Sequence, residues 1–479
     1  MRGGKSNIDL INGPVFKCMI LYSLPIILQG SFNIIYNLVD RYWVGWLPQG
    51  KEAIGSVSVG FSLFFFVMSL VFGIAMGAGI MIAQYRGAQD KKMVNLIARN
   101  FIGFGILAII GLAVIMVAAT EPILKLLKTP VEVLPDGVAY MQWIFAGLPI
   151  FYVFNGLTGI FRGLGDSTTP LKVAAWSTIF NIVLDPIFIL GPGPFPSLGV
   201  AGAAQATVLS NLLGAMILFP LLKKKHGDWV DLAPDGFRFD GKVISAILRL
   251  GLPTTASMVI LSVSIMVIQR FVNVLGVDAV AAYGVCTTLD SLLMMPAQSF
   301  AQSMSTIAGQ NIGAGKWERV DRFLASTLLV SGGVAIVVGL LLVKFSPWIA
   351  GFFLRDSADY NSVFPLIQIY VQIMLLRYLM MGLFFPINGT VRGAGDTMAA
   401  MWLVMFTQLI IRVPLTWLTQ YLGYGFPGIA VGLSMSTVFG LIIMSIYYRT
   451  GRWKRFALVN GPGICEIDET EEDIRPELI

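Results

Sequence analysis

The sequence predicts an all-α integral membrane protein whose twelve transmembrane helices form two six-helix lobes. Three observations lead to this fold class. Of the 479 residues, 56% are hydrophobic and only 13% are charged, and the mean hydropathy is +0.77, whereas soluble domains carry about 25% charged residues. Apolar segments of membrane-spanning length recur along the chain, and its two halves repeat the same short motifs. The composition therefore excludes a soluble enzyme, a nucleic-acid-binding protein and a disordered scaffold.

Twelve apolar segments are long enough to cross a bilayer, because a helix needs about 20 residues to span the ~30 Å hydrocarbon layer. The predicted spans are 15–46, 53–84, 93–120, 133–161, 170–191, 199–222, 243–276, 279–312, 319–349, 361–390, 397–422 and 427–448. The amino end has no compact apolar core followed by a small-residue cleavage site, so we expect no removable signal peptide.

The distribution of Lys and Arg predicts the orientation, because basic residues close to span ends are retained on the cytoplasmic side. With both termini inside, 24 of the 33 basic residues fall in cytoplasmic positions and six fall outside. The remaining three lie within spans. We therefore expect a multi-pass protein of the plasma (inner) membrane with both termini in the cytoplasm.

The longest polar loop, residues 223–242, follows the sixth span and divides the chain. It separates an N-lobe, residues 1–222, from a C-lobe, residues 243–450, and a cytoplasmic tail follows at 451–479. The only histidine, His226, lies in this loop, and we predict that it is a solvated linker residue.

The three cysteines are too few and too scattered for a disulfide framework or a metal cage. They are Cys18, Cys286 and Cys465. We predict that they are packing residues.

The two lobes share motifs at a nearly constant separation of 226 to 230 residues. The matched pairs are Leu24-Pro25 with Leu252-Pro253, Gln84/Gly87/Ala88 with Gln310/Gly313/Ala314, the RGxGD elements 162–166 with 392–396, and 199–201 with 428–430. Since six spans are an even number, both lobes enter the membrane in the same direction. Their pseudo-twofold axis must then run along the membrane normal, which suits alternating access to a central site.

The repeated elements have structural interpretations. The glycines of the RGxGD elements permit close packing or sharp turns, while their Arg and Asp can cap or pair. The stretch 310–317 resembles a phosphate-binding loop only faintly, because Gln310 and Trp317 replace residues that such a loop requires. Pro25 lies mid-span, where it favours a kink, and we single it out as a candidate hinge, with static packing as the alternative.

Two acidic residues stand out within the spans, because a charge at the bilayer centre costs about 2.5–3.5 kcal/mol on insertion scales. They are Asp40 in span 1 and Asp185 in span 5. A polar stripe leads to each of them along one helix face. The stripes consist of Gln29, Asn33 and Tyr36 before Asp40, and of Ser177 and Asn181 before Asp185. Both stripes are expected to line one wet cavity in the N-lobe.

Comparison of the two repeats indicates that the acid pair is specific to the N-lobe. The corresponding C-lobe stretches, 266–270 and 411–415, contain no acid, so the pair is predicted to be a site and not part of the shared scaffold. Two adjacent carboxylates in a low dielectric share a proton or a cation, which indicates a proton or Na⁺ switch. The alternative is that Asp40 pairs with Arg41 and that Asp185 caps a helix break at Pro186.

Other charges within the C-lobe spans are weaker candidates. Arg270, Arg377 and Arg412 can bind an anionic substrate group, but snorkelling or bonding to backbone carbonyls is the favoured interpretation. Asp290 in span 8 is left outside the main prediction.

Six segments of the chain resemble the multidrug and toxic compound extrusion (MATE) transporters. They are LVDRYWVG (38–45), AQYRGAQD (83–90), FRGLGDSTTP (161–170), NIVLDPIFILGPGPFPSLGVAGAAQAT (181–207), GQNIGAG (309–315) and VRGAGDT (391–397). The resemblance implies a V-shaped fold and efflux of organic, often cationic, compounds in exchange for protons or Na⁺.

The DinF-like and archaeal branch is the most similar one, and there the coupling acids lie in the first and fifth helices. The resemblance thus implies cation coupling at Asp40, Asp185 and Asn181, with Na⁺ at the two acids as one candidate. It also implies a supporting polar network of Asn33, Tyr36, Asn155, Thr207 and, more loosely, Tyr140. The NorM-like branch carries its acids in helices 7 and 10, but residues 254–265 and 384–393 contain no acid here.

We therefore expect a secondary multidrug antiporter that works as a monomer on small organic substrates within membrane lipid. No enzyme chemistry, nucleic-acid partner or cofactor beyond the coupling ion is expected, since no His, Cys or Ser constellation is present. The alternative is a lipid-linked precursor flippase of the same superfamily.

Overall fold

The computed structural model describes residues 8–47, 50–126, 129–191, 196–232, 239–353 and 357–459. Within these ranges, the side chains of residues 33–34, 37–38, 41, 50–62, 352–353 and 357–359 lie outside the description. The described part is helical and contains no strand. Cys465 and the acidic tail lie outside it, whereas Cys18 and Cys286 have free thiols and are buried, as expected of packing residues.

Fourteen α-helices make up the described chain. The first half contains α1 (Val15–Val44), α2 (Gly50–Gly87), α3 (Lys91–Leu126), α4 (Leu134–Ala146), α5 (Leu148–Gly163), α6 (Thr168–Leu190) and α7 (Gly199–His226). The second half contains α8 (Gly241–Val274), α9 (Val277–Gly313), α10 (Trp317–Phe353), α11 (Ser357–Gly393), α12 (Thr397–Met405), α13 (Arg412–Tyr421) and α14 (Gly425–Thr450). A π-helical stretch, Phe406–Ile411, joins α12 to α13, and a 3₁₀ turn, Arg452–Phe456, follows α14.

The described residues contain eleven membrane-length segments and one bent helix pair, which together give up to twelve spans. The bent pair is α4 and α5, which meet at 47° where a single fourth span was expected. Pro149, the second residue of α5, has no backbone donor, which favours a break at this point. A Cβ on Gly147 would collide with Val208 of α7, so α7 packs closely against the bend.

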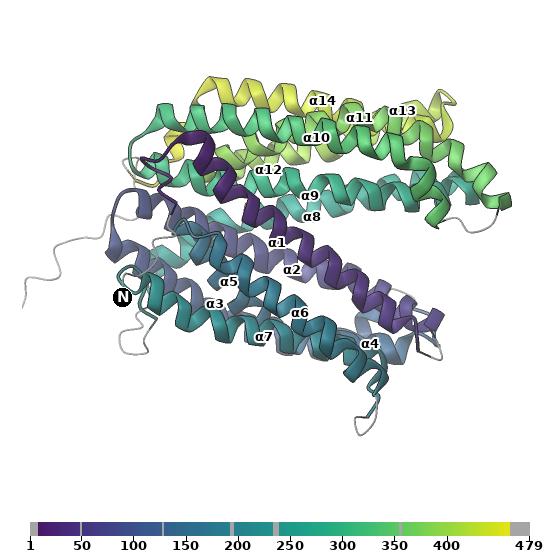
Figure 1. Ribbon diagram of the computed structural model, residues 1–479, viewed down its shortest axis with the longest axis horizontal. Helices are drawn as coiled ribbons and strands as arrows, with labels where there is room; N and C mark the ends of the chain where they lie inside the picture. The colour runs from purple at the N-terminus through teal and green to yellow at the C-terminus, as the bar shows by residue number, and fades with distance from the viewer. Residues whose placement is uncertain are drawn as a thin grey trace, which may run out of the picture.

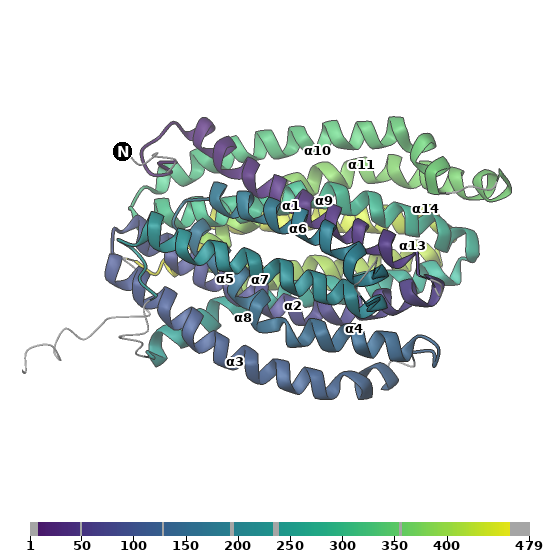
Figure 2. The same ribbon diagram turned by 60° about the horizontal axis from the view of Figure 1, so that its bottom comes forward.

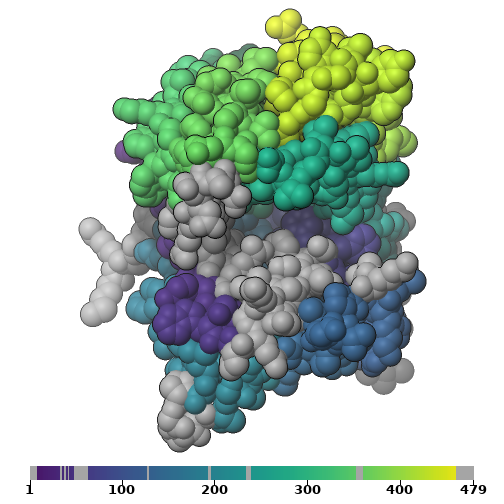
Figure 3. All heavy atoms as spheres, turned by 90° about the vertical axis from the view of Figure 1, so that its right-hand side faces the viewer, coloured from purple at the N-terminus to yellow at the C-terminus, as the bar shows by residue number. Residues whose placement is uncertain are grey.

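The two halves meet at one end of the molecule and diverge toward the other (Figure 1). Both ends of the described chain lie at the joined end, since Asn311 donates to the Leu10 carbonyl and the Leu458 amide donates to Gln84. Figure 3 views the opposite, open end, with the green and yellow second half above the purple and blue first half.

Two helices pack across the division between the halves. The beginning of α1, including Met19, Tyr22 and Ile26, belongs to a core formed by α9, α10, α11 and α14. Reciprocally, the beginning of α8, including Val243 and Leu250, belongs to the core of α2, α3, α5 and α7. Figures 1 and 2 show α1 running from the side of α10 toward α6. Each half is thus completed by the first helix of the other.

The joint between the halves is a close crossing of α2 and α9. A Cβ on Gly87 would collide with the Gln310 carbonyl, and one on Gly313 would collide with the Gln84 carbonyl. Beside these glycines, Gln84 Nε2 donates to the Gly393 carbonyl and Gln310 Nε2 donates to the Gly163 carbonyl, each over 2.8 Å. The same Gln and Gly of both repeats therefore exchange contacts across the pseudo-twofold axis.

The RGxGD elements form the turns at the joined end and confirm the structural interpretation. Gly165 and Gly395 have φ of 92° and 100°, which glycine adopts without strain. Asp166 accepts from the backbone N–H of Thr169, and Asp396 accepts from that of Ala399, so each caps the helix that follows. Arg162 donates to Gln302 and Gln29, two residues of other helices.

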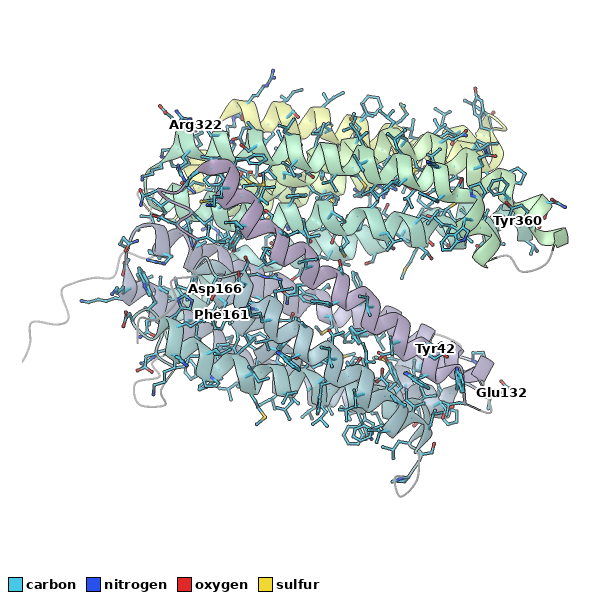
Figure 4. All side chains as sticks on the ribbon, in the orientation of Figure 1. Tyr42, Glu132, Phe161, Asp166, Arg322 and Tyr360 are labelled. Atoms are coloured by element: carbon cyan, nitrogen blue, oxygen red, sulfur yellow. The ribbon has the colours of Figure 1, made fainter. Side chains whose placement is uncertain are left out.

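The prediction that His226 is a solvated linker residue is wrong. The helix α7 continues to His226 itself, and the imidazole is buried against Phe161, with Nε2 lying 3.7 Å from Asp166 Oδ2. Figure 4 labels Asp166 and Phe161 at the joined end. Burial alone would raise the pKa of Asp166, but His226, Thr169 and the charge of Lys225 outweigh it and hold that pKa at about 2.

The chain end ties the two halves together at the joint. Trp453 is buried in the core that contains the beginning of α1, and it stacks on Tyr448. Five residues later, Leu458 packs in the opposite core, and its amide donates to Gln84 Oε1 over 2.8 Å. Residues 451–459 therefore form a strap across the joint.

Gly87→Ala should destabilise the protein, because a methyl group at this site has to displace the Gln310 backbone. We expect the free energy of unfolding to fall by about 1–3 kcal/mol, measured by thermal unfolding in detergent. Gly111→Ala on α3 is the control, since nothing lies within 4 Å of its Cβ position. Equal stability of the two variants would contradict the close crossing.

Asp166→Asn should lower stability at pH 7 by about 2 kcal/mol, since a shift of one pKa unit corresponds to about 1.4 kcal/mol. A depressed pKa gives stability that is present above pH ~4 and lost as the pH falls toward 2. The melting-temperature gap between wild type and variant should therefore narrow over that interval. A gap that is constant with pH would rule out the charge of Asp166 as its cause.

Candidate functional site

The candidate site lies where the ends of α1 and α6 approach α7. Asp40 is near the end of α1, and Asp185 is near the end of α6. Figure 4 labels Tyr42, two residues beyond Asp40, toward the open end of the molecule and far from Asp166. Both acids are thus remote from the joint, although α1 itself begins there.

The structure brings the two predicted acids together. The Asp40 carboxyl interacts with the side chains of Asp185, Asn181 and Thr207. On α6, Asn181 Nδ2 donates to Asp185 Oδ1 over 3.2 Å. The side chains are withdrawn from solvent, with Asp40 7% exposed and Asp185 0% exposed. Three helices therefore contribute to one buried polar cluster.

Four oxygen atoms in this cluster are buried without a hydrogen-bond partner among the described residues. They are Asp40 Oδ1, Asp185 Oδ2, Asn181 Oδ1 and Thr207 Oγ1. Unpaired buried polar atoms are costly, so a proton or a cation held between these neighbouring oxygens would stabilise the cluster. Carboxylate, amide and hydroxyl oxygens are suitable ligands for a hard cation, and a carboxyl pair can equally share a proton.

Small apolar residues hold the helices around the cluster close together. A Cβ on Gly202 of α7 would collide with the Phe188 carbonyl of α6, so these helices nearly touch. Val44, Ile189 and Ala203 form a compact core next to the acids. The polar cluster is therefore set in a tightly packed corner of the first half, where water can solvate it only in part.

The residues of the predicted supporting polar network differ in how close they lie to the acid pair. Tyr36 is within electrostatic range of Asp40, Asp185 and Tyr140, so the structure places both tyrosines near the pair. Asn155 instead donates to the carbonyl of Phe151, one turn earlier in its own helix, over 2.9 Å. The side chain of Asn33 lies outside the described residues.

The structure also bears on the alternative interpretation of the acids. α6 continues through Pro186 to Leu190, so Asp185 does not cap a helix break. The side chain of Arg41 lies outside the described residues. Gln29, which begins the polar stripe on α1, bonds to Arg162 at the joint and not to the acids. Pro25 lies inside the continuous helix α1, and its role as a hinge stays a prediction.

The second half contains a different buried polar network. Asp290 accepts hydrogen bonds from Arg377, Tyr370 and Tyr378. The prediction that these arginines snorkel or bond to backbone carbonyls is wrong for Arg377 and Arg412, which are buried and contact side chains, while Arg270 is exposed. Sequence spacing does not reveal the contacts of Asp290 with Arg377, Tyr370 and Tyr378, because these residues are far apart in the chain. Applying the repeat offset to Thr207 would have pointed to Ser436, which contacts Arg412.

No group of three or more His, Cys, Asp or Glu side chains gathers anywhere in the described ranges. The acid pair, with two carboxyl groups, lies below this number.

The MatE family model matches residues 25–187 and again residues 253–418. The chain belongs to the MatE family. The double match confirms the internal repeat, since both matched segments begin at a repeated proline, Pro25 and Pro253. MatE proteins are membrane transporters, which confirms the expected family and a non-enzymatic role; the DinF-like branch stays a prediction.

Curated relatives of this MatE protein cover nearly its whole length. A probable multidrug resistance protein of Bacillus subtilis, YoeA, is 31% identical over 92% of this chain and 95% of its own. A second probable multidrug resistance protein of the same organism, YpnP, is 30% identical over 94% of this chain and 98% of its own length. A solved outward-facing structure of a multidrug resistance MATE transporter matches with a TM-score of 0.85 over 94% of this chain and 98% of that one, at 22% identity. The fold is therefore that of the MATE transporters.

Asparagine at either acid should leave the MatE fold as stable as the wild type, or more stable. Two carboxyls in contact repel each other when both are ionised, and asparagine removes that repulsion at nearly constant volume. We expect the melting temperatures of Asp40→Asn and Asp185→Asn at pH 8 to equal or exceed that of the wild type.

Asp290→Asn is the contrasting variant in this measurement. It strips the buried guanidinium of Arg377 of its counter-charge, which should cost about 3–5 kcal/mol. If Asp40→Asn and Asp185→Asn lose as much stability as Asp290→Asn, the acid pair is a structural element of the fold.

Proposed function

We propose that this MatE protein is a secondary active multidrug efflux antiporter. It exports small organic, often cationic, compounds in exchange for H⁺ or Na⁺, works as a monomer by alternating access, and couples to the cation in its N-lobe. The observation that carries the proposal is the buried carboxyl pair, Asp40 and Asp185, with unpaired oxygens and no acidic counterpart in the repeat.

The orientation of the proposed cycle follows from the basic residues. Arg86, Lys91 and Lys225 lie at helix ends of the joined end, where Arg86 and Lys91 face Trp229. Basic residues of short loops are retained in the cytoplasm, so we take the joined end as cytoplasmic. The halves are then closed toward the cytoplasm and open toward the outside, the state that releases substrate and receives the cation.

The chemistry of coupling is the neutralisation of a buried charge. An incoming proton bonds the two carboxyls, or an incoming Na⁺ is held by them together with Asn181 and Thr207. In both cases the ion draws the end of α1 toward α6 and α7, because all of its ligands lie on these three helices. The occupied site is more compact than the empty one.

The helix α1 carries this change to the opposite half. Its beginning is fixed in the second core through Met19, Tyr22 and Ile26, whereas its end carries Asp40. Tyr22 also donates to the Arg162 carbonyl at the joint over 2.8 Å. Pro25 lies between the fixed part and the acid and lacks a backbone donor, so we propose it as the hinge about which the end of α1 moves.

Exchange requires that cation and substrate favour different states. A ligand with equal affinity for two conformations shifts nothing between them. We therefore propose that filling the acid site disfavours substrate binding in the outward-open state, and that release of the cation to the cytoplasm restores it.

The test is ethidium transport in proteoliposomes with the pH gradient and the Na⁺ gradient imposed separately. Wild type should transport with at least one gradient, and Asp40→Asn and Asp185→Asn should each lose at least tenfold in gradient-driven rate. Asp136→Asn, which alters a partly exposed acid on α4 of the same half, is the matched control and should retain the wild-type rate.

Two results would end the proposal. Wild-type rates in both acid variants would remove the coupling role of the pair. Movement of a lipid-linked sugar by the same vesicles, without any gradient-driven ethidium transport, would instead identify a lipid-linked precursor flippase.

A further inference from the structure

The interior of the second half contains an arginine without a counter-charge. Arg412 is 1% exposed and lies at the start of α13, directly after the π-helical stretch. Its Nε and Nη1 each lie 3.4 Å from a serine hydroxyl, those of Ser436 and Ser264. Its Nη2 is buried and has no partner within the described part of the chain. A buried guanidinium normally requires an anionic partner.

The acid near Arg412 is already committed elsewhere. Asp290 Oδ2 accepts from Arg377 Nη1 over 3.1 Å and from the Tyr370 hydroxyl over 2.9 Å, while Oδ1 accepts from Tyr378 over 2.7 Å. Arg377 and Asp290 both lie within electrostatic range of Arg412. Two arginines thus share one aspartate, and the network carries one uncompensated positive charge.

The hydrogen-bond donors of this network that are left without a partner in the described part of the chain all belong to guanidinium groups. Besides Arg412 Nη2, the Nε of Arg377 is buried without a partner among the described residues. Ser264 and Ser436 direct their own hydroxyl protons to the carbonyls of Gln408 and Leu433, so they act as acceptors for Arg412. The unused groups are therefore guanidinium N–H donors, which bind carboxylates and other anions.

The internal repeat relates this network to the acid site of the first half. Offsets of 227 to 229 residues take Asn181 to Gln408, Asp185 to Arg412, Tyr36 to Ser264 and Thr207 to Ser436. The two networks therefore occupy corresponding places, with an acid in one and a base in the other. A π-helical stretch precedes Arg412, and such stretches occur frequently at functional sites.

We propose that the second half contains a binding site for a small monovalent anion, held by the guanidinium groups of Arg412 and Arg377. The ligand is either free chloride or a carboxylate group of a transported compound. The site is separate from the cation pair and does not depend on which ion, if any, binds there.

The test measures the melting temperature of the detergent-solubilised full chain at constant ionic strength. Chloride or acetate replaces methanesulfonate, a bulkier anion, in a concentration series. A ligand that binds only the folded state raises the melting temperature as its concentration passes the dissociation constant. Wild type should show such a saturable rise with chloride or with acetate.

The variants assign the response to Arg412. Arg412→Gln should weaken the apparent affinity at least tenfold, and Arg412→Lys, which keeps the charge, should retain part of the response if Arg412→Gln does not fold. Arg270→Gln is the matched control, because this arginine of the same half is exposed. Asp40→Asn should respond like wild type, which separates this site from the cation site.

Each outcome decides the question. A response to chloride alone identifies a free-ion site, and a stronger response to acetate identifies a carboxylate site. Absence of a saturable response in wild type, or an equal response in Arg412→Gln, would overturn the proposal and leave Arg412 as a structural member of the network.

Discussion

The two halves are held together at one end of the molecule by the same glutamine-to-glycine hydrogen bond, which is made once in each direction. Gln84 of one repeat bonds to Gly393 at the end of α11, and Gln310 of the other bonds to Gly163 at the end of α5, while Gly87 and Gly313 let α2 and α9 touch. Because lipid offers no hydrophobic driving force between helices, such close backbone contact and interhelical hydrogen bonds are what fix the halves relative to each other. The divergence at the open end, and with it any central path for a substrate, is possible only because the joint is confined to the other end.

Two charged networks lie away from that joint, one in each half. The first has two acids with unpaired oxygens, and the second has two arginines that share one acid. Both are expensive in a membrane, and neither is needed to hold the repeat together, since the joint uses amides and glycines. A shared scaffold with different buried charges is the arrangement expected if the scaffold supports the motion and the charges determine what is carried.

The spans, the repeat and the convergence of Asp40 with Asp185 could be predicted because each depends on a local signal: length, spacing, or a charge in an apolar run. The errors involve partners distant in the chain. His226 was placed in a loop because the lysines before it are polar, yet α7 continues through them and delivers the ring to Asp166, 60 residues away. Arg377 found its partner Asp290 on α9, which no sequence spacing reveals, whereas the serines that contact Arg412 lie at the repeat offset from Tyr36 and Thr207. Asn155 Nδ2 bonds within its own helix, so the membership of Asn155 in the polar network stays a prediction.

The packing of α1 and α8 across the division between the halves suggests how the two halves arose. The beginning of each leading helix enters the core of the other half, while the end of α1 stays with α6 and α7 of its own half, so two copies of one six-helix chain could pair through the beginnings of their first helices. Duplication and fusion of the gene for such a homodimer would produce this topology directly. The fusion would also have released the two copies from identity, so that one could keep acids at a position where its twin acquired a base.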